Sequence, residues 1–464
     1  MTNKASSSLL DQALACHQNG HWSQALDLYH QVLADHPYQA NVLNNVGIIL
    51  QRFKRNDDAL SYFERALAVE PDHPPSLFNR GNVLRSLNRP LDAVHSYDHV
   101  LQIMPNHPEV LNNKGNALRA LNRLDDAQAN YQLALSYAPD YADAHWNAGL
   151  CFLLAGQYQL GWQEYEWRWA SELNAEKHLF TQSLWDGTDS LQGKTILLHA
   201  EQGFGDTLQF CRYASLVKKR GATVVLEVQA QLLNLLGTLK GVDLLIARGH
   251  PLPKFDYHCP LLSLPKAFAT DLDTIPHTSA YIAIDAKKSR LWRNKLGGNR
   301  HGGNRLGAQS KLSIGLVWAG SATHLNDHNR SIPLQELTSI VDQNADLYAL
   351  QKELREGDQE LLHQYPQIKY LGGHLKDFTD TAALIALMDV VITVDTAIAH
   401  LAGAMGKPVW ILLPYSPDWR WLLGRSDSPW YPAARLFRQT AIGDWESVLQ
   451  EVKQALQELQ GKAI

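Results

Sequence analysis

The sequence predicts an α-helical solenoid followed by an α/β part built as two parallel-sheet lobes. Residue types recur every 34 residues over the first third of the 464-residue chain. Such a fixed period is typical of stacked helical repeats. From Lys194 onward, short apolar runs alternate with amphipathic segments, which indicates strands and helices in a parallel sheet. A glycine-rich stretch divides this alternation into two series, and hence into two lobes.

The composition excludes several classes of protein. Hydrophobic residues make up 45% and charged residues 19%, as in ordinary globular proteins. A net charge of −5 gives no electrostatic reason to bind nucleic acid, and the acid excess lies in residues 1–170, with 12 Lys and Arg against 17 Asp and Glu. Four scattered cysteines indicate a reducing compartment. With neither a signal peptide pattern nor a transmembrane segment, we expect a cytoplasmic protein.

Four residue columns define the repeat. Each proline is preceded by an aromatic residue at eight positions, an alanine at twelve and a small residue at twenty-four. The columns are Pro37, Pro71, Pro105 and Pro139; Tyr29, Phe63, Tyr97 and Tyr131; Ala25, Ala59, Ala93 and Ala127; and Ala13, Gly47, Gly81 and Gly115. Over residues 6–173 the pattern resembles the tetratricopeptide repeat. The resemblance implies paired helices whose small residues allow close approach, with proline ending the second helix. We assign residues 1–173 to a solenoid of about five repeats.

An amide column indicates a ligand for the solenoid. Asn45, Asn79, Asn113 and Asn147 stand two residues before the small position. In this repeat family the position faces the concave groove, and the column resembles the amide ladder of protein O-GlcNAc transferases. An amide both donates and accepts, so it can hold the backbone of an extended protein or peptide. The alternative is that asparagine is a tolerated surface residue.

The fifth copy becomes aromatic, in GWQEYEWRW. A terminal repeat exposes a face that the next repeat would otherwise cover. We expect this face to dock on the following domain.

The remaining chain divides into four ranges after a linker over 174–192. The first lobe covers 193–290, a flexible interlobe linker covers 291–311, the second lobe covers 312–442, and a C-terminal helix covers 443–464. Two parallel lobes predict a ligand cleft at the carboxyl ends of their strands.

The loop HAEQGFGDT, after the first strand of the first lobe, holds one set of candidate residues. Gly203 and Gly205 allow close approach of the backbone, and Asp206 opens the next helix. A dinucleotide-binding fingerprint needs a third glycine where Leu208 stands, so an oxidoreductase is disfavoured. Asp206 is either a helix cap or a general base, and Glu201 is the alternative base.

A second set follows the strand VVITVD. Asp395 ends the strand, Thr396 occupies a helix N-cap position before Ala397, and His400 lies one turn along. The free N–H groups and the dipole of such a helix suit a diphosphate. His400 either donates to a phosphate oxygen or is a core histidine.

A third set lies in the loop AGSATHLNDHNRSIP. We assign Ser321 and Arg330 in this loop to the binding of a donor substrate, the molecule from which a group is transferred. Arg330 is a fixed cation that can offset the charge of a leaving group. His324, Asp327 and His328 in the same loop do not form a predicted metal site, and we expect neither a metal nor another cofactor.

The aromatic segment 414–432 follows the strand VWILLP. Its residues Trp419, Trp421 and Trp430, with Arg420 and Arg425, either stack on a base or sugar ring or pack the interlobe hinge. We include Trp419 among the donor-binding candidates.

Three motifs in order resemble glycosyltransferase family 9, which includes the lipopolysaccharide heptosyltransferases. They are G-x-G-D, a basic residue after the first strand of the second lobe, and D-T-A-x-x-H-L-A, over about residues 193–442. The resemblance implies a GT-B fold, Asp206 as general base, and a nucleotide diphosphate held by Arg330, Asp395, Thr396 and His400. The repeats, the short first lobe and the aromatic segment depart from the heptosyltransferases. They are similar instead to bacterial repeat-bearing glycosyltransferases that modify proteins, flagellin among them.

We therefore expect a metal-independent, inverting glycosyltransferase. It would move a sugar from a nucleotide-activated donor to a Ser or Thr hydroxyl of a protein, such as flagellin, held by the repeat groove. Two alternatives stay open: a lipopolysaccharide-type heptosyltransferase, and a non-catalytic peptide-binding scaffold with a degenerate GT-B domain.

Overall fold

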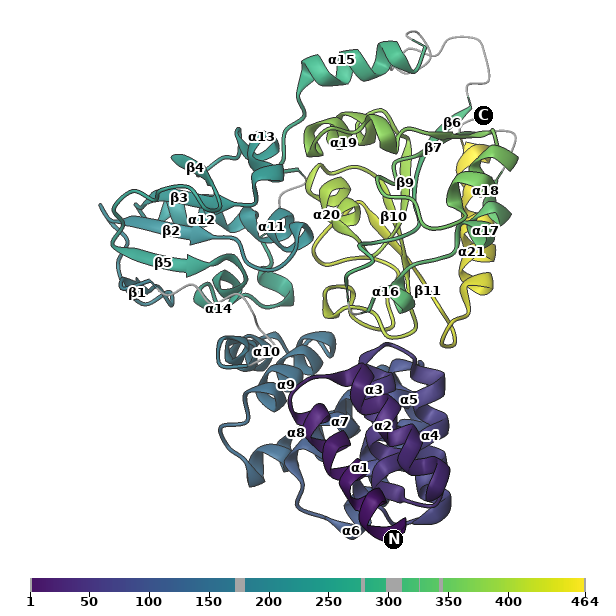
Figure 1. Ribbon diagram of the computed structural model, residues 1–464. Coiled ribbons are helices and arrows are strands. Elements are labelled where there is room, and N and C mark those ends of the chain that lie inside the picture. The colour runs from purple at the N-terminus through teal and green to yellow at the C-terminus, as the bar shows by residue number, and fades with distance from the viewer. Residues whose placement is uncertain are drawn as a thin grey trace. The chain divides into compact units, whose positions relative to one another are not determined.

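The computed structural model describes residues 2–171, 180–276, 280–297, 311–324, 326–341 and 345–462 (Figure 1). The chain forms two compact units, Met1–Cys151 and Phe152–Ile464, which we call the repeat unit and the α/β unit. The predicted fold class is confirmed: a helical solenoid precedes two parallel-sheet lobes of the GT-B type. The division between the units falls within the range predicted for the solenoid, so the second helix of the fifth repeat belongs to the α/β unit.

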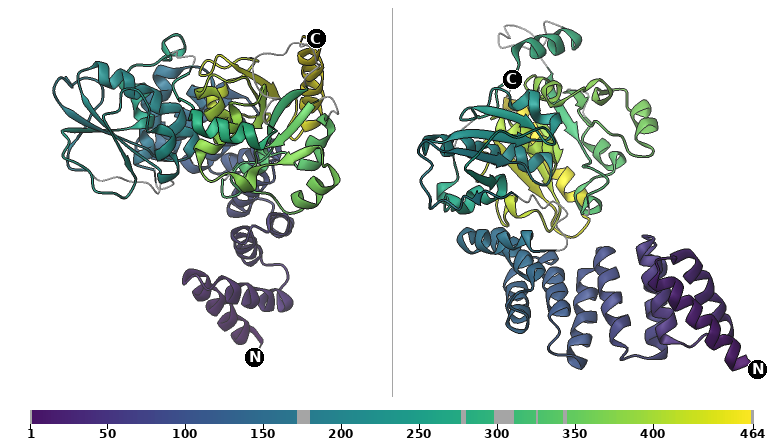
Figure 2. Two further views of the ribbon diagram at one scale, coloured as in Figure 1. Left: turned by 90° about the horizontal axis from the view of Figure 1, so that it is seen from above. Right: turned by 60° about the vertical axis from the view of Figure 1, so that its left-hand side comes forward.

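The repeat unit consists of helix pairs that lie side by side along the array (Figure 2). Its first helices are α1 Thr2–Gln18, α3 Ala40–Arg52, α5 Pro74–Ser86, α7 Pro108–Ala120 and α9 Ala142–Leu154. Its second helices are α2 Trp22–Asp35, α4 Asn56–Val69, α6 Pro90–Ile103 and α8 Leu124–Tyr137. Each second helix ends two residues before the proline column, because proline lacks the N–H that would continue the helix.

The glycine and aromatic columns meet inside each repeat. A Cβ atom built on Gly81 would lie 2.5 Å from a ring carbon of Tyr97, and Gly47 and Gly115 meet Phe63 and Tyr131 in the same way. These rings are fully buried. The small residue is therefore a packing requirement of the aromatic side chain that faces it from the second helix of the same repeat.

The first lobe of the α/β unit is a five-stranded parallel sheet in the order β1-β5-β2-β3-β4. Its strands are β1 Ser183–Leu184, β2 Thr195–His199, β3 Thr223–Val228, β4 Leu244–Ala247 and β5 Tyr257–Pro260. Its helices are α11 Phe204–Phe210, α12 Ala214–Lys219, α13 Leu233–Leu236 and α14 Leu264–Ala267. The segment predicted as a linker over 174–192 includes β1, which pairs with β5.

The second lobe is a six-stranded parallel sheet in the order β11-β10-β9-β6-β7-β8. Its strands are β6 Leu312–Val317, β7 Ala345–Ala349, β8 Ile368–Tyr370, β9 Val390–Val394, β10 Val409–Leu413 and β11 Ala434–Arg438. Its helices are α16 Asp327–Arg330, α17 Leu334–Leu337, α18 Asp358–Gln364, α19 Phe378–Ile385, α20 Ala397–Ala404 and α21 Trp445–Lys462. Between the lobes, α15 Ala286–Lys295 occupies the start of the range predicted as a flexible linker, of which residues 298–310 lie outside the described residues.

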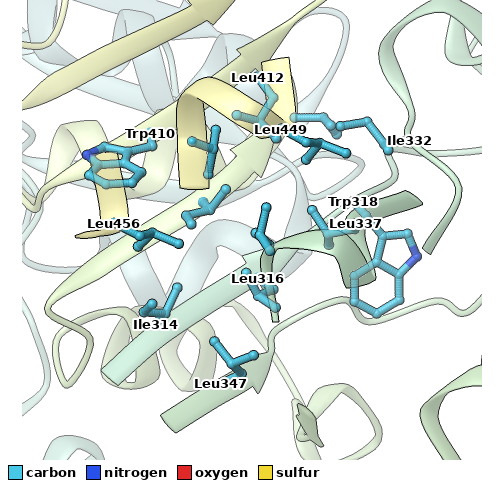
Figure 3. Close-up of a cluster of buried hydrophobic side chains, with 14 of the residues drawn as sticks. Ile314, Leu316, Trp318, Ile332, Leu337, Leu347, Trp410, Leu412, Leu449 and Leu456 are labelled. Atoms are coloured by element: carbon cyan, nitrogen blue, oxygen red, sulfur yellow. The ribbon is translucent and has the colours of Figure 1, made fainter. Parts of the chain in front are cut away.

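The hydrophobic core of the second lobe lies between its sheet and α21. Ile314, Leu316 and Leu347 on the strands face Leu449 and Leu456 on the helix (Figure 3). β6, β9 and β10 are buried along their whole length, as expected for parallel strands covered on both faces.

Each sheet has one point where the chain reverses its direction of strand addition. In the second lobe this point lies between β6 and β9, and in the first lobe it lies between β2 and β5. The loops leaving the two strands diverge there, and ligands of open α/β sheets bind in the resulting crevice. All three sets of predicted site residues follow β2, β6 or β9.

We predict that Gly81→Ala destabilises the repeat unit by about 1–3 kcal/mol, because the added methyl group collides with Tyr97 in a packed interior. Thermal unfolding followed by circular dichroism measures the effect. Gly461→Ala in α21 is the matched control, since a Cβ there meets nothing within 4 Å and should be neutral or slightly stabilising. Equal unfolding temperatures for Gly81→Ala and the wild type would contradict the packing argument.

Candidate functional site

Arg330 lies at the reversal point of the second lobe. It ends the short helix α16 in the loop after β6, and its Nη1 donates to the backbone oxygen of Asp395 at the end of β9, at 3.1 Å. The guanidinium passes so close to Gly320 that a Cβ atom there would overlap it. The structure thus brings Arg330 and Asp395 together, as the resemblance implied. Ser321 is exposed in the same loop, where its hydroxyl bonds the Thr323 hydroxyl at 2.8 Å.

The N-terminus of α20 begins directly after Asp395. Thr396 is the N-cap, and its Oγ1 accepts from the N–H of Ile398 at 3.2 Å. Ala397 is the first helical residue and is half-buried. Burial and the neighbouring Asp418 raise the pKa of the Asp395 carboxyl to about 6, and Arg330 opposes that rise. A carboxyl, a guanidinium and a helix N-terminus therefore share this edge of the sheet.

His400 is a buried histidine one turn into α20. Its Nδ1 lies 2.9 Å from the Tyr431 hydroxyl, and its ring stacks on Trp421 with centroids 5.4 Å apart. The other side of the ring faces Gly205 of α11, where a Cβ would lie 2.7 Å from the His400 Cδ2. Burial first, then nearby arginines including Arg420, lower the pKa of His400 well below its ordinary value, so the ring is neutral near pH 7. His400 thus lies where the two lobes meet.

Asp206 takes the capping role, one of the two that the sequence left open, and also pairs with an arginine that the sequence did not assign to it. Its Oδ2 accepts from the N–H of Gly203 at 2.8 Å, so it caps the start of α11. Its Oδ1 accepts from Nη2 of Arg420, which follows β10 in the other lobe. Burial raises the pKa of the Asp206 carboxyl, and Arg420 acts in the opposite direction. The candidate base is therefore half of an ion pair between the lobes.

Glu201 is in a different environment from Asp206. It is 2% exposed and forms a bidentate salt bridge with Arg168. Arg168 Nε donates to Glu201 Oε2 at 3.0 Å, and Arg168 Nη2 donates to Glu201 Oε1 at 2.9 Å. Oε1 also accepts from the N–H of Leu262, which follows β5. Burial raises the pKa of Glu201 and Arg168 opposes this. Both carboxylate oxygens are engaged in holding the reversal point of the first lobe.

Trp419 lies in an aromatic cluster at the end of the fifth repeat. It is 3% exposed and packs edge-on against Tyr158 and Trp162 of α10 Tyr158–Tyr165, and stacks on Phe210. Little of its ring is accessible to a ligand in this arrangement. Trp430 joins the cluster and donates from Nε1 to the Tyr158 hydroxyl at 3.1 Å.

The fifth repeat therefore contacts both lobes through its second helix. Trp162 donates to the backbone oxygen of Thr270 in the first lobe at 2.8 Å, while Trp419 and Trp430 belong to the second. In η1 Glu166–Trp169, Arg168 adds the salt bridge to Glu201. Sequence reasoning missed Arg168 as a site-supporting residue; its signal was an arginine between two tryptophans, Trp167 and Trp169.

The predicted groove amides lie on α3, α5, α7 and α9, and each donates one N–H to the preceding helices. Asn79 donates to Asn44 Oδ1 at 3.0 Å, and Asn147 donates to Asn112 Oδ1 at 3.0 Å. Asn113 donates to Asn82 Oδ1 at 3.1 Å, and Asn45 to the Tyr29 hydroxyl at 3.2 Å. The four amides are half-buried. These hydrogen bonds join consecutive repeats, a structural role that the sequence did not reveal.

Comparisons with known proteins divide the chain in the same way. Models of the tetratricopeptide repeat match residues 9–72, 47–108 and 115–156. The model of glycosyltransferase family 9 (heptosyltransferase) matches residues 367–423, which include Asp395, Thr396, His400 and Arg420. Segments similar to the tetratricopeptide repeat are thus followed, in one chain, by a segment similar to glycosyltransferase family 9.

A curated relative and two kinds of solved structure are also similar. Protein FlbA of Caulobacter vibrioides is 27% identical over 332 residues, 66% of this chain and 53% of that protein, so the chain spans about half the length of that relative. MamA from Desulfovibrio magneticus RS-1 is 17% identical with a TM-score of 0.34, covering 35% of this chain and 91% of that one. YrrB, a tetratricopeptide-repeat protein with an unusual peptide-binding site, is 20% identical with a TM-score of 0.32, covering 34% and 82%.

Among the residues that the structure describes, no group of three or more His, Cys, Asp or Glu side chains is arranged to hold a metal ion. Over the same residues, every helix is too short or too polar to cross a bilayer.

We predict that Arg168→Met costs about 3–5 kcal/mol of the free energy of unfolding, because it leaves Glu201 buried and uncompensated. Urea denaturation followed by tryptophan fluorescence measures it. Lys194→Met, which removes an exposed ion pair with Asp256 in the same lobe, should cost less than about 1 kcal/mol. Adding Glu201→Gln to Arg168→Met should recover part of the loss. A cost for Arg168→Met no larger than for Lys194→Met would refute this account.

We predict that Asp395→Asn becomes increasingly stabilising, relative to the wild type, as the pH rises from about 4 to about 7. The folded pKa is near 6 and the ordinary value is 3.8, so the stability given by the protonated carboxyl is lost as the pH rises through 6, and asparagine never ionises. The gain should be at most about 3 kcal/mol. Urea denaturation at several pH values measures it. Asp427→Asn should show little pH dependence over this range, because Arg425 lowers the pKa of that exposed carboxyl below its ordinary value and its pH-dependent contribution therefore lies below about pH 4. A pH-independent effect of Asp395→Asn would contradict the prediction.

Proposed function

We propose that this protein is a glycosyltransferase that moves a sugar from a nucleotide-activated donor to a Ser or Thr hydroxyl of a protein. The observation that carries the proposal is the grouping of Arg330, Asp395 and the N-terminus of α20 at the reversal point of the second lobe. Asp395 and α20 lie in the segment that matches family 9, and Arg330 bonds to Asp395. Asp206, from the other lobe, is joined to the same region through Arg420.

In the proposed reaction, the oxygen of the acceptor hydroxyl forms a bond to the anomeric carbon of the sugar. The bond from that carbon to the phosphate oxygen breaks, and the nucleotide leaves with the electron pair. Asp206 takes the hydroxyl proton, a contribution typically worth about 10²–10⁴-fold in rate. Attack opposite the leaving group inverts the anomeric centre. Of the two candidate bases, Asp206 is preferred because Glu201 is fully enclosed in its salt bridge with Arg168, whereas Asp206 is partly exposed where the lobes meet.

The negative charge that develops on the leaving group is the main electrostatic demand of this reaction. Arg330 and the N–H groups at Thr396 and Ala397 would meet that demand, and such preorganised donors typically contribute about 3–4 kcal/mol each. We therefore propose a metal-independent reaction. Asp395, with its raised pKa, would be least repulsive to phosphate when it is protonated.

The acceptor is proposed to be a protein because the chain carries an array of tetratricopeptide repeats with a column of amides. Each side-chain amide of the column donates one N–H to a neighbouring repeat. Its second N–H can donate to a peptide carbonyl. The backbone groups of an extended protein segment recur at regular intervals. A regularly spaced column of amides can therefore bond to such a segment at several points. Flagellin is one candidate acceptor.

The test begins with thermal-shift screening of the full chain against UDP, GDP, ADP and CMP, because a ligand of the native state raises its unfolding temperature. With the matching nucleotide-sugar, Asp206→Asn should lower the rate of transfer by about 10²–10⁴-fold while the donor still binds. Asn79→Ala combined with Asn113→Ala should raise the KM for a protein acceptor and leave donor hydrolysis unchanged.

The outcomes separate the alternatives. If the wild type binds no nucleotide, the peptide-binding scaffold is favoured. If transfer by Asp206→Asn equals that of the wild type, another group is the base. If lipopolysaccharide is glycosylated at a rate that the two alanine substitutions do not change, the acceptor is a lipid-linked saccharide and the proposed protein acceptor is wrong.

A further inference from the structure

Arg420 is placed to act on both halves of the proposed reaction. It lies in η8 Trp419–Trp421, in the segment that follows β10, and it is buried. Its side chain crosses to the first lobe, where Nη2 donates to Asp206 and Nε donates to Gln209 Oε1 at 2.6 Å. Its third bond, from Nη1 to Asp418 Oδ1 at 2.9 Å, stays within its own segment. One guanidinium thus joins the candidate base to the lobe of the donor site.

Arg420 is also close to the residues assigned to the donor. The next residue, Trp421, stacks on His400 of α20, and His400 in turn faces Gly205, the residue before Asp206. The positive charge of Arg420 acts on both Asp395 and His400, as that of Arg330 does. A diphosphate bound at the start of α20 would therefore lie within electrostatic reach of two arginines.

The ion pair opposes the function of Asp206 as a base. A carboxylate that accepts from a guanidinium has part of its negative charge compensated, which lowers its affinity for a proton. A diphosphate carries more charge than one carboxylate and offers several oxygens to the guanidinium fork. The two anions therefore compete for one cation, and the competition favours the diphosphate.

We infer that Arg420 couples donor binding to base activation: the donor diphosphate draws the guanidinium from Asp206, and the uncovered carboxylate then accepts the proton of the acceptor hydroxyl. This inference rests on the proposed function. When the nucleoside diphosphate departs, Arg420 returns to Asp206, favours its ionised form and so releases the proton to water. Arg420 is thus a donor ligand and a positioning residue for the base.

Direct binding measurements test the competition. Isothermal titration of the full chain uses whichever of UDP, GDP and ADP the wild type binds, together with the parent nucleoside. Asp206→Asn should tighten binding of the diphosphate about threefold or more, because asparagine carries no charge to hold Arg420. Arg420→Gln should weaken it about tenfold or more. In the double variant, Asp206→Asn should have no further effect, and binding of the nucleoside should change in none of the variants.

Asp427→Asn is the matched control, since it removes the ion pair with Arg425 in the same aromatic segment and should leave both affinities unchanged. If Asp206→Asn fails to fold, Arg420→Lys tests the same competition: it keeps a cation without the fork and should weaken binding of the diphosphate alone. Unchanged or weaker binding of the diphosphate by Asp206→Asn, or equal losses for nucleoside and diphosphate with Arg420→Gln or Arg420→Lys, would overturn this inference alone. A wild type that binds none of the three nucleotides would overturn the proposed function, and the inference with it.

Discussion

A buried guanidinium must be paired, because an isolated charge taken out of water costs several kcal/mol. In the described part of the α/β unit, Arg168, Arg212 and Arg420 are all buried. Each has at least one partner that lies far from it in the sequence. Arg168 and Arg420 bind the carboxylates of Glu201 and Asp206, and Arg212 donates to the backbone oxygen of Trp430 at 2.9 Å. These pairings hold the loops that leave the parallel strands.

The organisation of the fold was predictable because it follows from local periodicity. The glycine at position 81 and the tyrosine at 97 recur every 34 residues, and the physical reason for the pairing is the contact that the structure shows. The resemblance to family 9 implied that Arg330 and Asp395 hold the same diphosphate, and the structure brings them together at a reversal point that only the observed strand order reveals. By contrast, the division between the units could not be read from the repeat pattern, because the second helix of the fifth repeat keeps the repeat residues while packing with the lobes.

The partners of the site residues were beyond sequence reasoning. A carboxylate that opens a helix has the same local pattern whether it caps that helix, takes a proton or binds an arginine. Asp206 is within three residues of the N–H that it caps, but 214 residues separate it from Arg420. Trp419 posed the same difficulty, because an aromatic residue after a strand can cover a ligand or fill a junction, and its burial depends on Trp162, which is far from it in the sequence. Tertiary packing decides which partner each of these side chains contacts, and a short stretch of sequence does not reveal that packing.

The amides that join successive repeats fix the distance between neighbouring first helices of the array. Because Asn79 is tied to Asn44, and Asn147 to Asn112, the spacing between neighbouring first helices is set by side chains on the same column that is proposed to hold a ligand. A bound protein segment that contacts several of these amides would fix that spacing. Bending or stretching of the solenoid would then change its affinity for the segment, and binding would restrict the bending. Repeat arrays without such cross-ties would accommodate their ligands by flexing, whereas this one would select segments whose pitch already fits.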